Sequence, residues 1–418
     1  MVNITNSTLR KDAEKIYTAA LREAMPEEAV RRALREMRPV EELVLVAIGK
    51  AAWRMAKAAC DELGERIACG AVITKYGHSE GPIANLSIYE AGHPILDENG
   101  LEAAKAALEL TKRESEGRAV LFLVSGGGSA LFESLLPGVT LEYMRGLNSR
   151  LLACGADIQE INTIRKLFSA VKGGRFARHC APSKIYQIVL SDVLGDDLGS
   201  IASGPAAPNP ARAEDIRHIN DKYSLGIDDK VIESQRPVDT PNVTTVMAAN
   251  VRILCEAAAR RAEELGYNAY IIDDAVDGDV EELAERIYGA SKLAGAQDSP
   301  YRRPCALIFG GEPTVRLKGK GLGGRNQELA LIMAKYLAGS DGMVFVSCGS
   351  DGTDGPTEAA GGMTDGSTWD LISKRGADPA ALLADNDSNR ALKIGDSLIV
   401  TGPTGTNVND LMLLLVDR

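Results

Sequence analysis

The feature that most limits the fold of this chain is a series of short apolar runs, each closed by a polar or glycine-rich turn and most followed by a helical pattern. In the first half these runs cover residues 43–48, 71–73, 119–124 and 185–190. Runs that are apolar throughout are typical of parallel strands buried on both faces. We therefore expect an N-terminal doubly wound α/β/α sheet of the Rossmann type, whose ligands lie beyond the carboxyl ends of its strands.

A second α/β series follows a proline-rich, polar stretch at about 205–242. Because 418 residues exceed what a single core usually supports, we expect two domains, residues 1–235 and 236–418. The strands expected in the second domain cover 243–248, 269–272, 306–309, 343–346 and 397–400. Thr314–Leu317 alternates in polarity after a very short turn, which predicts an antiparallel pair and hence a mixed sheet.

Composition and charge limit the kinds of partner, metal site and cell compartment that we expect for this chain. The net charge is −11 and no window forms a basic stripe, which argues against nucleic acid as a partner. The polar N-terminus lacks the core of a secretory signal, and no apolar stretch is long enough to cross a membrane. The seven cysteines form no CxxC pair and the four histidines are dispersed, so we expect reduced thiols, no zinc site and a cytoplasmic protein. Whether the chain forms a homodimer stays open.

The clearest candidate site is the turn after the run at 119–124, where a strand, three glycines and a helix follow one another. Its residues are Ser125, Gly126, Gly127, Gly128 and Ser129. Successive N–H groups at such a turn, together with the helix dipole, bind phosphate or carboxylate. The turn is not a Walker A loop, because no Gly-Lys-Ser or Gly-Lys-Thr follows at the required spacing. The alternative is a tight turn that only packs a helix closely on a strand.

Two charged residues stand directly after buried runs of the same sheet. Lys50 opens a helix after 43–48, so we expect its ammonium at the carboxyl edge, where a cation can neutralise a transferring phosphoryl group. Asp192 follows 185–190, a position from which a carboxylate binds a metal or accepts a proton. The structural alternatives are a solvent-exposed lysine and a helix-capping aspartate.

Polar side chains also gather on the helix expected at 157–166 and on the basic turn after it. Asn162, Arg165, Lys166 and Lys172 are candidates for substrate contacts. The alternative is an ordinary charged, solvated face.

Two glycine-rich turns near the C-terminal end, at 321–328 and 350–356, predict a site for phosphate and metal. Glycine lets backbone N–H groups approach an anion, and Arg325 supplies a planar cation. Asp351 and Asp354 offer hard oxygen ligands of the kind that Mg²⁺ prefers.

Polar residues at other strand ends and helix starts add to this site. Glu312 follows the run at 306–309, and Asn409 follows the run at 397–400. With Asn326, at the start of the helix after the first glycine-rich turn, they are expected to bind substrate or phosphate.

The segment 319–324 also fits GxGxxG, the fingerprint of dinucleotide binding, but a lone match is weak. The residues before it include Arg316 and Lys318 instead of a buried run, and the next expected strand ends in Ser-Asp-Gly-Thr-Asp-Gly. Dinucleotide binding is therefore the lesser interpretation.

Long strings of residues occur in order along nearly the whole chain. They include VAIGKAAWRMA at 46–56, LVSGGGSALFE at 123–133, EINTIRK at 160–166 and VLSDVLGDDL at 189–198, followed by IFGGEPTV, GGRNQELAL, GSDGTDGPTEAAGG and TGPTGTNVNDL. In these strings the chain resembles the class II glycerate kinases, whose C-terminal part is called the MOFRL domain. The resemblance implies two α/β domains with the active site between them, and transfer of the γ-phosphoryl group of ATP to glycerate, generally at the 2-hydroxyl, with Mg²⁺.

The resemblance also implies roles for single residues. Lys50 and Arg325 match basic residues of the family's cleft and Asp192 matches a family acid, so these three are the expected catalytic residues. The expected Mg²⁺ ligands come from Asp192, Asp351 and Asp354, and the expected substrates are D-glycerate and ATP. The rival interpretations are an NAD(P)-dependent hydroxypyruvate reductase and a non-catalytic sensor of a sugar acid or nucleotide.

Overall fold

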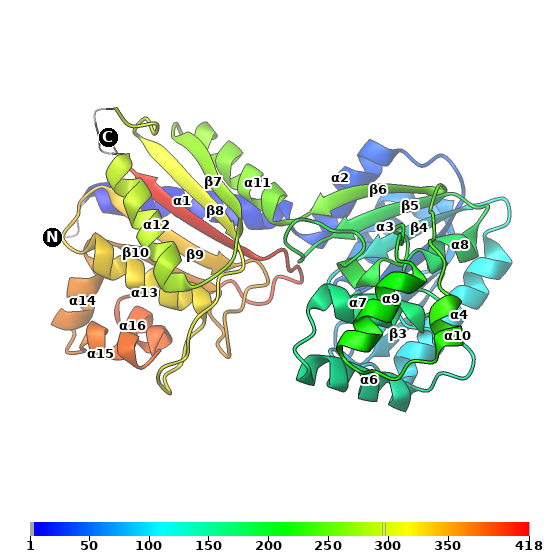
Figure 1. Ribbon diagram of the computed structural model, residues 1–418. Helices are drawn as coiled ribbons and strands as arrows, with labels where there is room; N and C mark the ends of the chain where they lie inside the picture. The colour runs from blue at the N-terminus through cyan, green and yellow to red at the C-terminus, as the bar shows by residue number, and fades with distance from the viewer. Residues whose placement is uncertain (1–3, 295, 297, 418) are drawn as a thin grey trace. The chain divides into compact units, whose positions relative to one another are not determined.

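The protein folds into two compact units, which we describe from a computed structural model covering residues 4–294, 296 and 298–417. One unit comprises Pro26–Ala248, and the other joins the described residues up to Met25 to those from Ala249 onward. Each unit contains a six-stranded sheet with helices packed on it (Figure 1). The expected two-domain α/β architecture is therefore confirmed. No helix of the described ranges is long and apolar enough to cross a membrane.

The sheet of the Pro26–Ala248 unit has the strand order β3-β2-β1-β4-β5-β6, and the pairs from β3 to β5 are parallel. Its strands are β1 (Leu43–Ile48), β2 (Ile67–Lys75), β3 (Leu86–Ala91), β4 (Ala119–Val124), β5 (Ile185–Leu190) and β6 (Val243–Ala249). This is the doubly wound order of the Rossmann fold, in which ligands bind where the order reverses. Here the reversal lies between β1 and β4.

Helices cover both faces of this sheet. Its helices are α2 (Pro26–Met37), α3 (Ala52–Leu63), α4 (Glu98–Glu114), α5 (Gly128–Leu131), α6 (Leu141–Ala153), α7 (Ile158–Leu167), α8 (Arg175–Cys180), α9 (Ala213–Lys222) and α10 (Asp229–Glu233). Phe122 of β4 packs on Phe176 of α8 with ring centroids 4.6 Å apart, and Phe132 packs edge-on to Phe176 at 5.4 Å. This aromatic cluster anchors the chain on both sides of the turn after β4. A separate apolar cluster joins α6, α7 and α9.

The sheet of the second unit is mixed, as expected, with the order β11-β10-β9-β12-β8-β7. Its strands are β7 (Asn268–Val276), β8 (Cys305–Gly311), β9 (Met343–Gly349), β10 (Gly361–Asp365), β11 (Leu398–Ile399) and β12 (Asp410–Val416). Its helices are α1 (Ile4–Glu23), α11 (Val251–Glu264), α12 (Val280–Leu293), α13 (Arg325–Leu337), α14 (Thr368–Lys374), α15 (Pro379–Ala384) and α16 (Ser388–Ile394). β12 runs antiparallel to both β8 and β9 at the centre of the sheet.

The predicted strand Thr314–Leu317 is wrong. Thr314 forms only an isolated bridge to Asp279, and the residues from 315 to 324 form no helix or strand. The antiparallel pairs of this sheet come instead from β12, which pairs with β8 and β9, and from β10, which pairs with β9 and β11.

The division of the chain also differs from the expected boundary at 235/236. β6, expected to open the second sheet, lies beside β5 at the edge of the first. α1 belongs to the second unit because Ala13, Ile16 and Ala20 are fully buried in it and the helix packs on α11 and β9. Apolar burial, rather than chain order, decides which unit these segments join.

Candidate functional site

The turns after β1 and β4 are joined by hydrogen bonds at the point where the strand order reverses. The backbone N–H of Lys50 donates to the carbonyl of Gly126 at 2.9 Å, and the N–H of Ala51 donates to Ser125 Oγ at 3.1 Å. Gly49 has φ of 113°, and a Cβ there would lie 2.3 Å from Ser125 Oγ. Only glycine allows the two turns to approach this closely.

Residues 125–129, which we call the N-terminal glycine turn, present backbone donors that the protein itself does not use. The N–H of Gly128 donates to the carbonyl of Ser125 at 3.3 Å. Within the part of the chain that the structure describes, the N–H groups of Gly126, Gly127 and Ser129 donate to no acceptor, and all three residues are partly exposed. Such a run of unused donors before a helix suits an anion, as the sequence predicted for this turn.

Three titratable side chains surround this turn. A Cβ on Gly126 would lie 2.3 Å from Asp192 Oδ2, so the Asp192 carboxylate packs directly over that glycine. A Cβ on Gly127 would lie 3.0 Å from His93 Cδ2 and 3.2 Å from Lys50 Cε. The structure thus brings Lys50 and Asp192 to the turn and adds His93, which lies in the string YEAGHP at 89–94 but was not predicted as a site residue.

Lys172 is fully buried beneath the turn, so the structure gives it a different place from the expected substrate contact. Its ammonium contacts Glu133 Oε2 at 2.9 Å and donates to the carbonyls of Ser129 at 2.8 Å and Phe132 at 3.1 Å. These three acceptors use all three of its donors. Burial lowers the pKa of Lys172, and the carboxylate of Glu133 opposes that shift. This geometry supports a role in holding the turn, not in touching a ligand.

The candidates on α7 lie beside the same turn. Ser203 Oγ donates to Asn162 Oδ1 at 3.0 Å and lies 2.7 Å from Ser129 Oγ. Arg165 donates to the carbonyl of Ser129 at 3.1 Å. Burial lowers the pKa of Lys166, against the opposing charge of Asp197. Asn162 is therefore tied to the turn through Ser203, whereas Lys166 is oriented toward the loop that carries Asp197.

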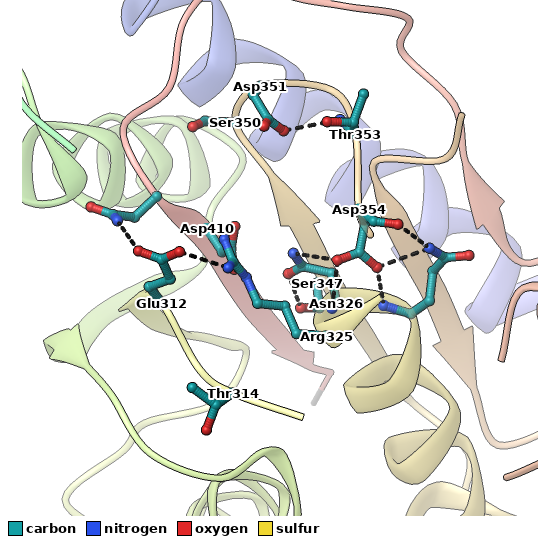
Figure 2. A network of polar contacts seen from close by, with 12 residues as sticks. Glu312, Thr314, Arg325, Asn326, Ser347, Ser350, Asp351, Thr353, Asp354 and Asp410 are labelled. Carbon is teal, nitrogen blue, oxygen red and sulfur yellow. Dashed lines mark hydrogen bonds and ion pairs between the residues drawn. The ribbon is translucent and has the colours of Figure 1, made fainter. Parts of the chain in front are cut away.

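In the second unit, Arg325 is held between two carboxylates (Figure 2). Its Nε donates to Asp410 Oδ2 at 2.6 Å and its Nη2 to Asp410 Oδ1 at 3.1 Å, while Nη1 donates to Glu312 Oε1 at 2.7 Å. Asn409 Nδ2 reaches Glu312 Oε2 at 3.3 Å. We call these four residues the Arg325 network. Burial raises the pKa of Asp410, and the guanidinium of Arg325 opposes that shift.

Asp354 caps the helix that begins at Arg325. Its Oδ1 accepts from the N–H of Asn326 at 3.1 Å, and its Oδ2 accepts from the N–H and the side chain of Gln327, both at 2.9 Å (Figure 2). The side-chain carbonyl of Asn326 in turn accepts a hydrogen bond from Ser347 Oγ at 2.6 Å. Asp354 and Asn326, expected to bind metal and substrate, are thus both engaged in fixing the start of α13.

Asp351 is the more available carboxylate of the expected metal pair. It is half-buried, and its Oδ1 accepts from the N–H of Thr353 at 3.0 Å (Figure 2). Among residues 4–294, 296 and 298–417, no group of three or more His, Cys, Asp or Glu side chains is placed to hold a metal ion. A divalent ion bound here would have to take most of its ligands from substrate and water.

The glycines of the GxGxxG segment pack against the protein itself. The N–H groups of residues 318 and 319 donate to Asn386 Oδ1, and that of Lys320 donates to Asp385 Oδ1 at 3.1 Å. Cβ atoms at Gly319 and Gly321 would lie 2.3 Å and 2.5 Å from atoms of residues 385 and 387. Of the turn expected to bind phosphate, the N–H groups of Gly321 and Leu322 likewise donate to acceptors in residues 385–387.

Both units of the chain match known protein families. Residues 12–236, more than half of the chain, match a domain of unknown function (DUF4147), and residues 305–410 match the MOFRL family. The D-glycerate 2-kinase of Thermotoga maritima is 48% identical over 98% of this chain and 99% of that protein. The chain belongs to the MOFRL family of glycerate kinases.

Structure and a further relative add to this family assignment. A crystal structure of glycerate kinase from Thermotoga maritima superimposes with a TM-score of 0.94 over 98% of this chain and 100% of that one. A relative from Agrobacterium vitis, named provisionally as a hydroxypyruvate reductase, is 37% identical over 97% of this chain and 94% of that protein. MOFRL-family proteins thus carry names for two different activities on chemically adjacent compounds.

Proposed function

We propose that this protein is a kinase that transfers the γ-phosphoryl group of ATP to the 2-hydroxyl of D-glycerate, giving 2-phosphoglycerate and ADP. The 48% identity to a D-glycerate 2-kinase over nearly the full length of both chains carries the proposal. The unused donors of the N-terminal glycine turn support it, because both substrates are anions that need such donors.

In this proposal the chain acts mainly by positioning and by stabilising charge. The N–H groups of Gly126, Gly127 and Ser129 bind an anionic group, and Lys50 beside them neutralises charge on the phosphoryl group. The hydroxyl of glycerate attacks the γ-phosphorus in line, and ADP leaves. Arg325, fixed by three charged hydrogen bonds, serves the same reaction as an oriented cation.

Mg²⁺ is the metal we propose, and it would neutralise charge on the phosphate oxygens of ATP. Mg²⁺ usually binds through one or two carboxylates together with phosphates and water, so a large acidic cluster is not required. Asp192 and Asp351, one in each unit, are the two alternative protein ligands that we propose. Asp354 would have to give up its helix-capping hydrogen bonds to take part.

The cell compartment that we propose is the cytoplasm. All seven cysteines are free thiols, and five of them have pKa values raised well above the usual range by burial, namely Cys60, Cys180, Cys255, Cys305 and Cys348. Unreactive, unpaired thiols suit a reducing compartment.

The alternative function is an NAD(P)-dependent hydroxypyruvate reductase, favoured by the name of the Agrobacterium relative and by the GxGxxG segment. The dinucleotide fingerprint needs glycines whose backbone approaches a pyrophosphate. Here Gly319 and Gly321 pack on residues 385–387 and Gly324 packs on Asp354 instead, which weakens this alternative.

A coupled assay of ADP release separates the two functions. The proposed kinase releases ADP only when ATP and D-glycerate are both present, and it leaves nicotinamide absorbance unchanged. Oxidation of NADH or NADPH with hydroxypyruvate, without ADP release in the presence of glycerate, would establish the reductase instead.

A further inference from the structure

We propose that His93 accepts the proton of the substrate hydroxyl as the phosphoryl group is transferred. The inference rests on the proposed kinase function and deepens it. His93 belongs to the segment between β3 and α4 and was not among the residues predicted to form the site.

The imidazole of His93 lies beside the N-terminal glycine turn. A Cβ on Gly127 would lie 3.1 Å from His93 Nε2 and 3.2 Å from Lys50 Cε, so the ring and the lysine flank the same glycine. An anion seated on the N–H groups of Gly126 and Gly127 therefore lies beside the ring. A general base must come within about 3 Å of the proton it accepts, directly or through one water.

The ring of His93 differs from two other histidines of the protein in its hydrogen bonding. His78 Nδ1 lies 3.1 Å from the carbonyl of Lys50, and His179 Nε2 lies 3.0 Å from the carbonyl of Leu108. His93 is half-buried, yet neither of its ring nitrogens makes a hydrogen bond with another residue in the described part of the chain. An imidazole turned toward a binding turn with both nitrogens unused is suited to meet a ligand.

The electrostatic surroundings keep the ring in the form that accepts a proton. Burial lowers the pKa of His93, and the positive charges of Lys50, Lys75 and His78 lower it further. Asp97, the acid on the same segment, is engaged in hydrogen bonds of its own. The pKa of His93 therefore lies below the ordinary histidine value, and these surroundings favour the neutral ring that can accept a proton.

In the proposed step the phosphoryl group and the hydroxyl proton move in opposite directions. A bond forms between the glycerate oxygen and the γ-phosphorus, and the bond from that phosphorus to the bridging oxygen of ATP breaks. ADP leaves with the electron pair, the hydroxyl proton moves to a ring nitrogen of His93, and the imidazolium then releases it to water. Asp192, packed over Gly126, is left to bind the metal or to orient the substrate.

The test compares the pH dependence of turnover in the unsubstituted protein, here called the full chain, and in the His93→Gln variant. We expect His93→Gln to lower kcat at pH 7 by about 10² to 10⁴, the usual contribution of a general base. For the full chain, kcat/KM should fall with a slope of one as the pH drops through a pKa below 6.5. That acid limb should disappear in His93→Gln while the affinities for ATP and glycerate stay close to those of the full chain.

Two further variants keep the test decisive. His93→Ala should regain part of its turnover when imidazole is added, which a purely structural defect would not. His218→Gln, which changes an exposed histidine on α9, should match the full chain. An unchanged acid limb in His93→Gln, or a loss confined to KM, would overturn the inference. Failure of the full chain itself to release ADP with glycerate would instead overturn the proposed function.

Discussion

Replacing Gly126 by alanine should abolish most of the activity while leaving the fold in place. The added Cβ would lie 2.3 Å from Asp192 Oδ2 and 2.9 Å from its Cγ. Because non-bonded heavy atoms prefer separations of about 3.5 Å or more, either the carboxylate or the turn must move by about 1 Å. A displacement of that size in a catalytic site can cost about 10² in rate. Overpacking of this kind costs about 1–3 kcal/mol of stability, which a domain can tolerate.

The assay for Gly126→Ala is steady-state ADP release with saturating ATP and glycerate, with thermal unfolding as the check on folding. Gly146→Ala is the matched control, since a Cβ at this position inside α6 meets no heavy atom within 4 Å. It should keep full activity and gain about 0.5–1 kcal/mol of stability. Because Gly126→Ala acts through Asp192, adding it to Asp192→Ala should cost little more than Asp192→Ala alone. Unchanged turnover in Gly126→Ala would refute the reasoning.

Three further substitutions test the buried lysine that holds the N-terminal glycine turn and the two proposed catalytic cations. Lys172→Met should destabilise the protein by about 3–5 kcal/mol, because it leaves the Glu133 carboxylate buried without its cation. Urea unfolding should show that much of this stability returns when Glu133→Gln is added to Lys172→Met. Equal stability of the single variant and the full chain would count against this role. Arg325→Lys keeps the charge but loses the paired hydrogen bonds to Asp410, and we expect turnover to fall by about 10³ or more with the thermal midpoint little changed. Lys50→Ala should likewise lose most of its turnover and stay folded, so a near-normal rate in either purified variant would contradict the assignment.

The sequence predicts the part of the site that depends on local order. The run at 119–124 is apolar throughout, three glycines follow it, and the wound topology places such a turn at a strand end. Lys50 and Asp192 were found for the same reason, because each directly follows a buried strand. In the structure both side chains lie beside that turn, and their roles in the site stay predictions.

The rest of the site depends on partners far away in the chain. A glycine-rich segment looks the same whether its N–H groups face a ligand or Asp385, some sixty-five residues later. From the sequence, Lys172 is expected to be an exposed turn residue, because only the fold brings Glu133 beside it. β12 was missed for a related reason, since an apolar run does not reveal that it pairs with β8 and β9 at the centre of a sheet.

The most direct test of the central claim is phosphorus NMR of the products formed by the purified protein with ATP, Mg²⁺ and D-glycerate. The proposed function predicts one 2-phosphoglycerate for each ADP released, with no ADP when glycerate is left out. ADP without any phosphoglycerate, or phosphate appearing only on the 3-hydroxyl, would contradict it.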